Sequence, residues 1–170
     1  MPRWGCRSPP AAARVRSTSN FGQRVVTRTL RTQAIRLLAR REYARAELEA
    51  RLIGAGGDAG EVRIALDDLG AQGLLSDQRF ARAVVGQKAG RFSRRSIAGG
   101  LKAKGVAPDD IDEALREADL DDDAALTALW QRRFGKAPAN DREKARQIRY
   151  LQARGFAVSA ILKLLRAPPE

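Results

Sequence analysis

The side chains in this chain that could do chemistry are mostly cations, and they occur in blocks. Residues 1–41 of the 170-residue chain hold ten Arg and no acid. Residues 77–108 hold eight bases and one acid, and residues 131–170 hold ten bases and three acids. Acids dominate the two blocks between them, 42–76 and 109–130. Basic blocks of this kind bind phosphate backbones by releasing counterions, and alternating blocks also suit a protein partner with charged grooves.

The residue types that most catalytic and zinc sites need are missing. The chain has no His and one Cys, Cys6, which excludes a zinc site with the usual nitrogen and sulfur ligands and excludes His-based catalysis. It has no Walker-type loop and no GxGxxG after a strand. Asp119, Asp121, Asp122 and Asp123 form an acidic cluster, but a helix N-terminus rich in Asp explains it better than a calcium loop. We therefore expect no enzyme, no cofactor and no metal.

The elements that must position the cations are helices. Ala, Leu, Arg and Glu dominate the sequence, and long alternating runs of Val, Ile and Thr are missing, so an all-α fold is predicted. A hydrophobic content of 44% suffices for a core, and at 5% aromatic residues that core is mostly aliphatic. No segment approaches 18 uninterrupted apolar residues, and a single Cys fits a reducing compartment.

An internal repeat of 49 to 50 residues organises the chain. Each copy places apolar residues eight and four positions before a glycine, and six and ten positions after it. The three copies are Leu48, Leu52, Gly56, Val62 and Leu66; Ile97, Leu101, Gly105, Ile111 and Leu115; and Gln147, Leu151, Gly155, Ile161 and Leu165. Apolar residues four apart share one helix face, and glycine ends a helix in the left-handed conformation at little cost. The pattern favours packing units of a helical solenoid over a DNA-binding helix-turn-helix, and only Gln147 departs from it.

Three units of three helices are predicted. The unit 32–76 contains helices over residues 32–41, with Thr32 as N-cap, 44–53 and 62–71. The unit 77–120 contains a helix that Ser76 or Asp77 caps and that ends at a break over 88–92, then helices over 94–104 and 111–118. The unit 121–170 contains helices over 124–134, 141–154 and 159–166. Gly99 and Gly100 lie inside a predicted helix, where each costs about 1 kcal/mol relative to Ala, and either close packing or a weak helix would explain them.

The segment 1–31 is predicted to be a disordered basic tail, because it mixes Pro, Ser, Thr, Ala and Arg without helical periodicity. An unremarkable N-terminal extension is the interpretation we rank first. A basic arm that contacts nucleic acid and a segment similar to an organelle transit peptide are the alternatives.

The folded part resembles the RecX family of regulators of the RecA recombinase. Besides the repeat, the resemblance rests on GLLSDQRFA at 73–81, LKAKGV at 101–106, RRFGK at 132–136 and KARQIRYLQARGF at 144–156, and it covers residues 32–166. It implies three tandem three-helix repeats in a curved, elongated array. It also implies a cytoplasmic, non-enzymatic protein that acts in DNA repair, homologous recombination and the SOS response. Gly99 and Gly100, the long turn over 54–60 and the tail depart from the family pattern.

The resemblance further implies binding to RecA and to its filaments on single-stranded DNA. Family members mostly inhibit RecA: they lodge in the filament groove and restrain ATP hydrolysis, strand exchange and coprotease activity. Binding to free DNA, single- or double-stranded, is also expected, and we expect a monomer without membrane or small-molecule partners.

On this hypothesis the two basic blocks of the folded part face the filament groove and its DNA. The candidate residues are Lys88, Arg91, Arg94, Arg95, Lys102 and Lys104 in the middle unit and Arg132, Arg133, Lys136, Arg142, Lys144, Arg146 and Arg149 in the last. For each of them a solvated helix face is the simpler alternative. Two other classes of function stay open: a helical DNA-binding module without a RecA role, although no array of Arg, Asn and Gln for base readout stands out, and a scaffold for another protein.

Overall fold

A computed structural model describes residues 19–167, with side chains described from residue 29 onward. Over this range the chain forms nine α-helices and no strand. They are α1 (Ser19–Leu38), α2 (Arg45–Gly54), α3 (Ala59–Ala71), α4 (Asp77–Lys88), α5 (Arg94–Lys102), α6 (Pro108–Glu117), α7 (Asp122–Arg133), α8 (Asp141–Gln152) and α9 (Val158–Arg166). Among them, none combines the length and the apolar character that crossing a membrane requires.

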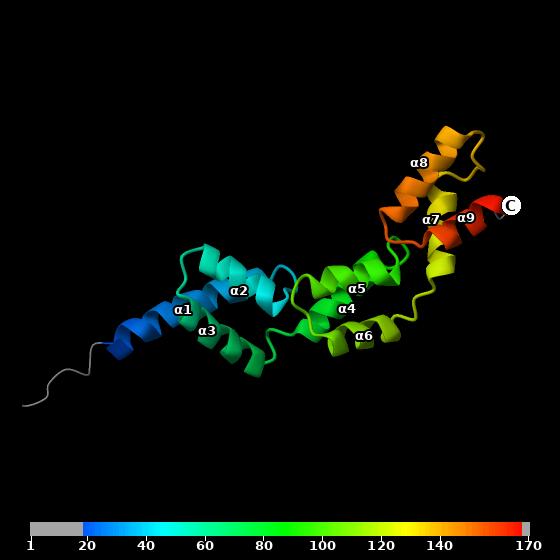
Figure 1. Cartoon of the computed structure of the whole chain (residues 1–170). Helices are drawn as coiled ribbons and strands as arrows, with labels where there is room; N and C mark the ends of the chain where they lie inside the picture. Colours follow the sequence, from blue (N-terminus) through cyan, green and yellow to red (C-terminus); the bar gives the residue numbers. More distant parts are fainter. Residues whose placement is uncertain (1–18, 168–170) are drawn as a thin grey trace, which may run out of the picture.

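The helices are grouped in threes along an elongated array, and the last group is turned away from the line of the first two (Figure 1). Each group has a hydrophobic cluster of its own. The first runs from Leu30 to Leu75, the second is centred on α4, α5 and α6, and the third runs from Leu126 to Leu165. The predicted all-α class of three tandem three-helix repeats is therefore confirmed.

The repeat in the sequence corresponds to the core. All twelve non-glycine positions of the repeat are buried, at 9% exposure or less. The three repeat glycines have φ values of 95°, 79° and 88°, in the left-handed region that an L side chain rarely enters. Gln147, the one polar residue of the pattern, is 5% exposed and occupies the inward position that its place in the repeat predicts.

Several predicted helix starts have the expected chemistry. The Ser76 side chain accepts a hydrogen bond from the backbone N–H of Arg79 at the start of α4. Pro108 opens α6, where its missing N–H leaves no intrahelical bond unmade. The Asp121 carboxylate accepts from the N–H groups of Asp123 and Ala124, so the acidic cluster begins a helix as predicted. Within the described range, no group of His, Cys, Asp or Glu could hold a metal ion.

The predicted start of the first helix is wrong. Helix α1 begins at Ser19 and continues through Thr32, which is therefore no N-cap. Residues 1–18 lie outside the described range. The part of α1 whose side chains are described packs into the first core through Leu30 and Ala34, which are 5% and 0% exposed.

The two glycines inside α5 do not serve close packing. A methyl group at Gly99 would have nothing within 4 Å, and one at Gly100 would meet only the Nζ atom of Lys88, at 3.5 Å. Of the two explanations offered for them, close packing is therefore excluded.

Candidate functional site

Two joints connect the three units, and they are built to one plan. At the first, the Asp77 carboxylate of α4 accepts a 2.7 Å hydrogen bond from the backbone N–H of Arg45, which opens α2. At the second, the Asp122 carboxylate of α7 accepts a 2.8 Å bond from the N–H of Arg94, which opens α5. In both, the first helix of one unit satisfies a free N–H at the second helix of the unit before it.

The repeat glycines complete the joints. A methyl group at Gly105 would lie 2.8 Å from the Cβ of Ala46, in the unit before it. A methyl group at Gly155 would lie 2.5 Å from the Cβ of Ser96 and 2.6 Å from the Oγ of Ser93. The backbone carbonyl of Arg154 also accepts a 3.0 Å bond from the Ser93 N–H. These turns therefore approach the preceding unit closely because they carry no side chain.

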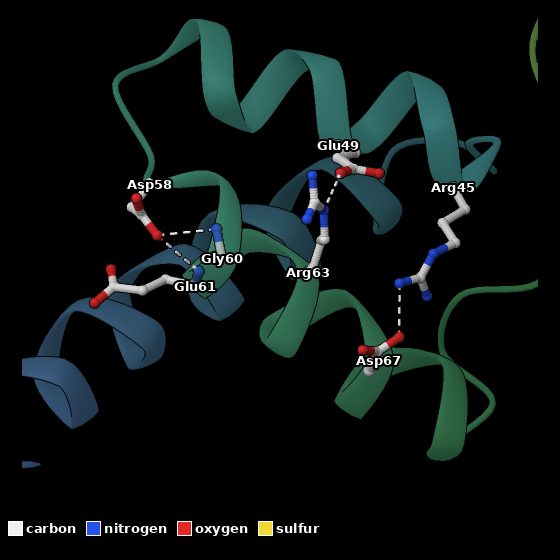
Figure 2. A network of polar contacts seen from close by, with 7 residues as sticks. All are labelled: Arg45, Glu49, Asp58, Gly60, Glu61, Arg63 and Asp67. Atoms are coloured by element: carbon white, nitrogen blue, oxygen red, sulfur yellow. Dashed lines mark hydrogen bonds and ion pairs between the residues drawn. The ribbon is translucent and has the colours of Figure 1, made fainter.

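Several cations of the first unit and of the first joint are paired with carboxylates. Figure 2 shows Arg45 paired with Asp67 and Arg63 paired with Glu49, at 2.6 and 3.1 Å. Across the first joint, the Nζ of Lys104 lies 2.6 Å from Glu47. Lys104, one of the candidate residues, is thus already engaged in an ion pair within the fold.

We expect the stability of the first joint to depend on pH through the carboxyl group of Glu47. Burial raises the pKa of this carboxyl, but hydrogen bonds from Lys104 and Arg41 outweigh that effect and leave the pKa below its ordinary value. A carboxyl whose pKa is lower when folded stabilises the fold above its unfolded pKa and loses that contribution as the pH falls through the folded one.

We expect Glu47→Gln to remove about 0.5 kcal/mol at neutral pH and to flatten the loss of stability below about pH 5. Urea unfolding measured between pH 6 and pH 3 checks this. Asp68→Asn is the control, because Asp68 is exposed and has no ion-pair partner in the described chain. If the free energy of unfolding fell as steeply with decreasing pH in Glu47→Gln as in the wild type, the prediction would be contradicted.

The third unit differs from the first. No ion pair links side chains within the part of it that the structure describes, 121–167, although most of its cations are exposed. Arg132 and Arg133 lie in the last turn of α7, where the negative end of the helix dipole favours cations. Glu143 is used at the start of α8, where it accepts from the N–H of Ala139. The basic charge of this unit is therefore available to a partner.

The structure brings together five of the thirteen candidate residues. A hollow between the second and third units, of about 460 Å³, is lined by Arg91, Arg132 and Arg133 together with Arg154. A smaller hollow, of about 250 Å³, is lined by Arg133, Lys136 and Arg146, but it also contains Glu143. Charge without a nearby carboxylate thus gathers at the second joint.

The other candidate residues are spread over α4, α5 and α8. Lys88 is partly buried, with its Nζ 5.5 Å from the centre of the Phe92 ring. Arg94 and Arg95 are exposed at the start of α5 and Lys102 at its end. The remaining residues lie exposed along α8 and are Arg142, Lys144 and Arg149.

Arg154 is the functional candidate that the sequence analysis missed. Its guanidinium lies 3.6 Å from the centre of the Tyr150 ring, and its Nη1 donates to the Tyr150 carbonyl at 3.0 Å. One signal could have found it: Arg154 stands directly before Gly155, as Lys104 stands directly before Gly105. The two positions correspond in the repeat, but only Lys104 has a carboxylate partner.

The fold and the surface define a protein of tandem three-helix repeats whose second joint and third unit carry unpaired basic charge. Comparison with family models finds the second three-helix domain of RecX over residues 76–115 and the third three-helix domain of RecX over 121–165.

Curated relatives extend this match over most of the chain. A regulatory protein RecX from Leptothrix cholodnii is 40% identical over 138 residues, which cover 81% of this chain and 88% of the relative. One from Chromobacterium violaceum is 41% identical and covers 81% of this chain and 90% of the relative. The chain belongs to the RecX family.

Solved structures agree on the fold. RecX from Lactobacillus salivarius superimposes with a TM-score of 0.61 at 16% identity, over 84% of this chain and 98% of that one. A second structure of a regulatory protein RecX gives a TM-score of 0.65 at 17% identity, over 85% of this chain and 73% of that one. Identities this low bear on the fold alone.

Proposed function

We propose that this protein regulates the RecA recombinase in the cytoplasm, mostly as an inhibitor, by binding the RecA filament on single-stranded DNA. Membership of the RecX family over 81% of the chain is the observation that carries the proposal. On this proposal the protein restrains ATP hydrolysis, strand exchange and coprotease activity, and so modulates DNA repair and the SOS response. It does so by binding and not by catalysis.

The charge distribution supports the way in which the protein would bind. Residues 77–108 and 131–170 are strongly basic, whereas residues 42–76 hold three bases and seven acids. We therefore assign the second and third units to the groove of the filament and its DNA, and the first unit to a lesser role. An elongated array of three units (Figure 1) is suited to contact more than one subunit of a filament. Bound to neighbouring subunits, the array would restrict access to the bound DNA or hold the subunit interfaces in place.

The direct test is RecA-dependent ATP hydrolysis on single-stranded DNA with increasing amounts of this protein. We expect hydrolysis to fall at protein levels well below that of RecA, because one molecule placed in the groove affects several subunits. No effect at equimolar, folded protein would contradict the proposal. It would leave a DNA-binding module or a protein scaffold, and DNA binding that weakens steeply with rising salt would identify the former.

A charge reversal tests the middle unit. In Arg94→Glu/Arg95→Glu/Lys102→Glu we expect half-inhibition of RecA to need at least about tenfold more protein, because attraction to a phosphate backbone becomes repulsion. The fold should survive, since acids are favourable in the first turn of α5 and Lys102→Glu, at the negative end of its dipole, costs at most about 1 kcal/mol.

The matched control for that variant reverses three exposed arginines of the first unit, Arg36, Arg40 and Arg51. It carries the same net charge but should inhibit RecA nearly as the wild type does. Unchanged inhibition in the folded α5 variant would exclude the middle unit from the interface.

A further inference from the structure

The hollow at the second joint has a composition that favours an anionic ligand. Four arginines line it with Phe92, Leu129 and Tyr150, and no carboxylate is among the lining residues. Like charges held close together repel; solvent screens part of this repulsion, since Arg91, Arg132 and Arg133 are exposed, and a bound anion would remove the rest. The C-terminal turn of α7 offsets part of the repulsion, but no side chain in the described chain forms an ion pair with any of the four.

Two of the four arginines are partly held in place before any ligand arrives. The guanidinium of Arg154 lies 3.6 Å from the centre of the Tyr150 ring, and that of Arg133 lies 5.7 Å from the same centre. Tyr150 is itself held by an edge-to-face contact with Phe134, with ring centres 5.3 Å apart. Since the Tyr150 ring already contacts cations, it is not free to stack on a base, and charge is what remains for recognition.

The hollow also spans the joint. Arg91 and Phe92 belong to the connection between α4 and α5 of the second unit, whereas the other lining residues belong to α7, α8 and the turn after α8. The two units have separate cores, and the contacts between them include a helix-end hydrogen bond from Arg94 to Asp122 and the close approach of Gly155 to Ser93 and Ser96. An anion held by arginines from both sides would therefore also fix the angle between the units.

We propose that this four-arginine hollow, formed by Arg91, Arg132, Arg133 and Arg154, binds phosphate groups of a single nucleic-acid strand and thereby clamps the third unit against the second. Arginine donates in a planar fork that matches phosphate oxygens, which makes phosphate the anion that four guanidinium groups fit best. A flexible single strand can bend to place a phosphate in a hollow of about 460 Å³ between two units at less cost than a duplex, whose persistence length is about 150 bp. The inference deepens the function proposed above and rests on its premise that these units meet nucleic acid.

The test is the binding of a labelled thymidine oligonucleotide, followed by fluorescence anisotropy at several salt concentrations without RecA. Arg91→Gln/Arg132→Gln removes the two lining arginines that have no partner in the described chain. We expect about a tenfold loss of affinity for each arginine, and a plot of log affinity against log salt that is shallower by about 1.4, because each lost phosphate contact lowers the slope by about 0.7.

Arg36→Gln/Arg51→Gln is the control with the same net charge, and it should bind within about threefold of the wild type, since these arginines lie outside the hollow. Equal losses in the two variants would mean that the strand responds to net charge alone, and would overturn the proposal. Competition by inorganic pyrophosphate separates the sources of phosphate. If pyrophosphate binds the hollow but the oligonucleotide affinity is the same in the wild type and Arg91→Gln/Arg132→Gln, the strand assignment is wrong.

The clamp has a readout of its own. Hydrogen exchange of the Ser93 amide, which donates across the joint to the Arg154 carbonyl, should slow when the oligonucleotide binds the wild type but not when it binds Arg91→Gln/Arg132→Gln. Unchanged exchange in the saturated wild type would overturn the clamp.

RecA assays on the same samples keep the two proposals apart. Strand binding that depends on the hollow without any effect on RecA would reject the proposed function alone. Inhibition of RecA with strand binding that is indifferent to the hollow would reject this inference alone.

Discussion

Gly155→Ala is expected to destabilise the protein by roughly 2–5 kcal/mol, more than the same change at either of the other repeat glycines. The φ value of 88° accounts for about 1–2 kcal/mol of this, since an L side chain is disfavoured there. The rest comes from the added methyl group, which would lie 2.5 Å from Ser96 Cβ and 2.6 Å from Ser93 Oγ. Ser93 is 1% exposed and its Oγ caps the N–H of Ser96, so it cannot move aside cheaply.

The three repeat glycines form an internal series for this prediction. Gly56 has a φ of 95° but nothing within 4 Å of an added methyl group, so Gly56→Ala measures the backbone penalty alone. Gly105→Ala adds one close contact, with Ala46 Cβ at 2.8 Å, and should fall between the two. Urea unfolding followed by circular dichroism gives the three values. If Gly155→Ala lowered the free energy of unfolding no more than Gly56→Ala does, the second and third units could move apart at no cost. The close approach at Gly155 would then not stabilise the array.

The core of this protein could be predicted from its sequence because the repeat encodes it locally. Positions four apart on a helix share a face whatever lies elsewhere in the chain, and glycine marks each turn. The extension of α1 had no such local signal. Leu30 is buried because it packs in the first core with residues of α3, and a methyl group at Gly57 would meet its side chain at 2.9 Å. That partner lies far along the chain, so the basic composition of the segment dominated the prediction.

The candidate site could be predicted only in its residue types. The thirteen candidate cations were chosen because they lie in the two basic blocks of the folded part. The sequence does not show which of them is paired with a carboxylate. Lys104 is paired with Glu47 across the first joint, whereas Ser96 occupies the position of Glu47 in the next unit and offers Arg154 no carboxylate. Arg91 and Arg154 meet because Gly155 allows the two units to approach closely. That the thirteen residues bind RecA or DNA stays a prediction.

Gln147→Leu completes the apolar repeat and is nevertheless expected to destabilise the third unit by about 1–3 kcal/mol. The Gln147 Oε1 accepts a 2.8 Å hydrogen bond from the indole Nε1 of Trp130, and these side chains are 5% and 2% exposed. Leucine would leave that indole N–H buried without an acceptor, and the desolvation cost of an unpaired donor exceeds the gain from one more apolar side chain. The Nε2 of Gln147 also donates to the Lys136 carbonyl, but at 3.3 Å this bond is a minor part of the effect.

A double-mutant cycle isolates the pair. Trp130→Phe removes the donor and leaves the Oε1 of Gln147 without a partner, whereas Trp130→Phe/Gln147→Leu removes both polar groups. We expect the double variant to be more stable than the sum of the two single changes predicts, with a coupling energy of about 0.5–3 kcal/mol. Urea unfolding of the four proteins gives this coupling. Gln147→Leu more stable than the wild type would show that the third core tolerates a bare indole N–H. In that case the polar exception in the repeat would have no structural reason.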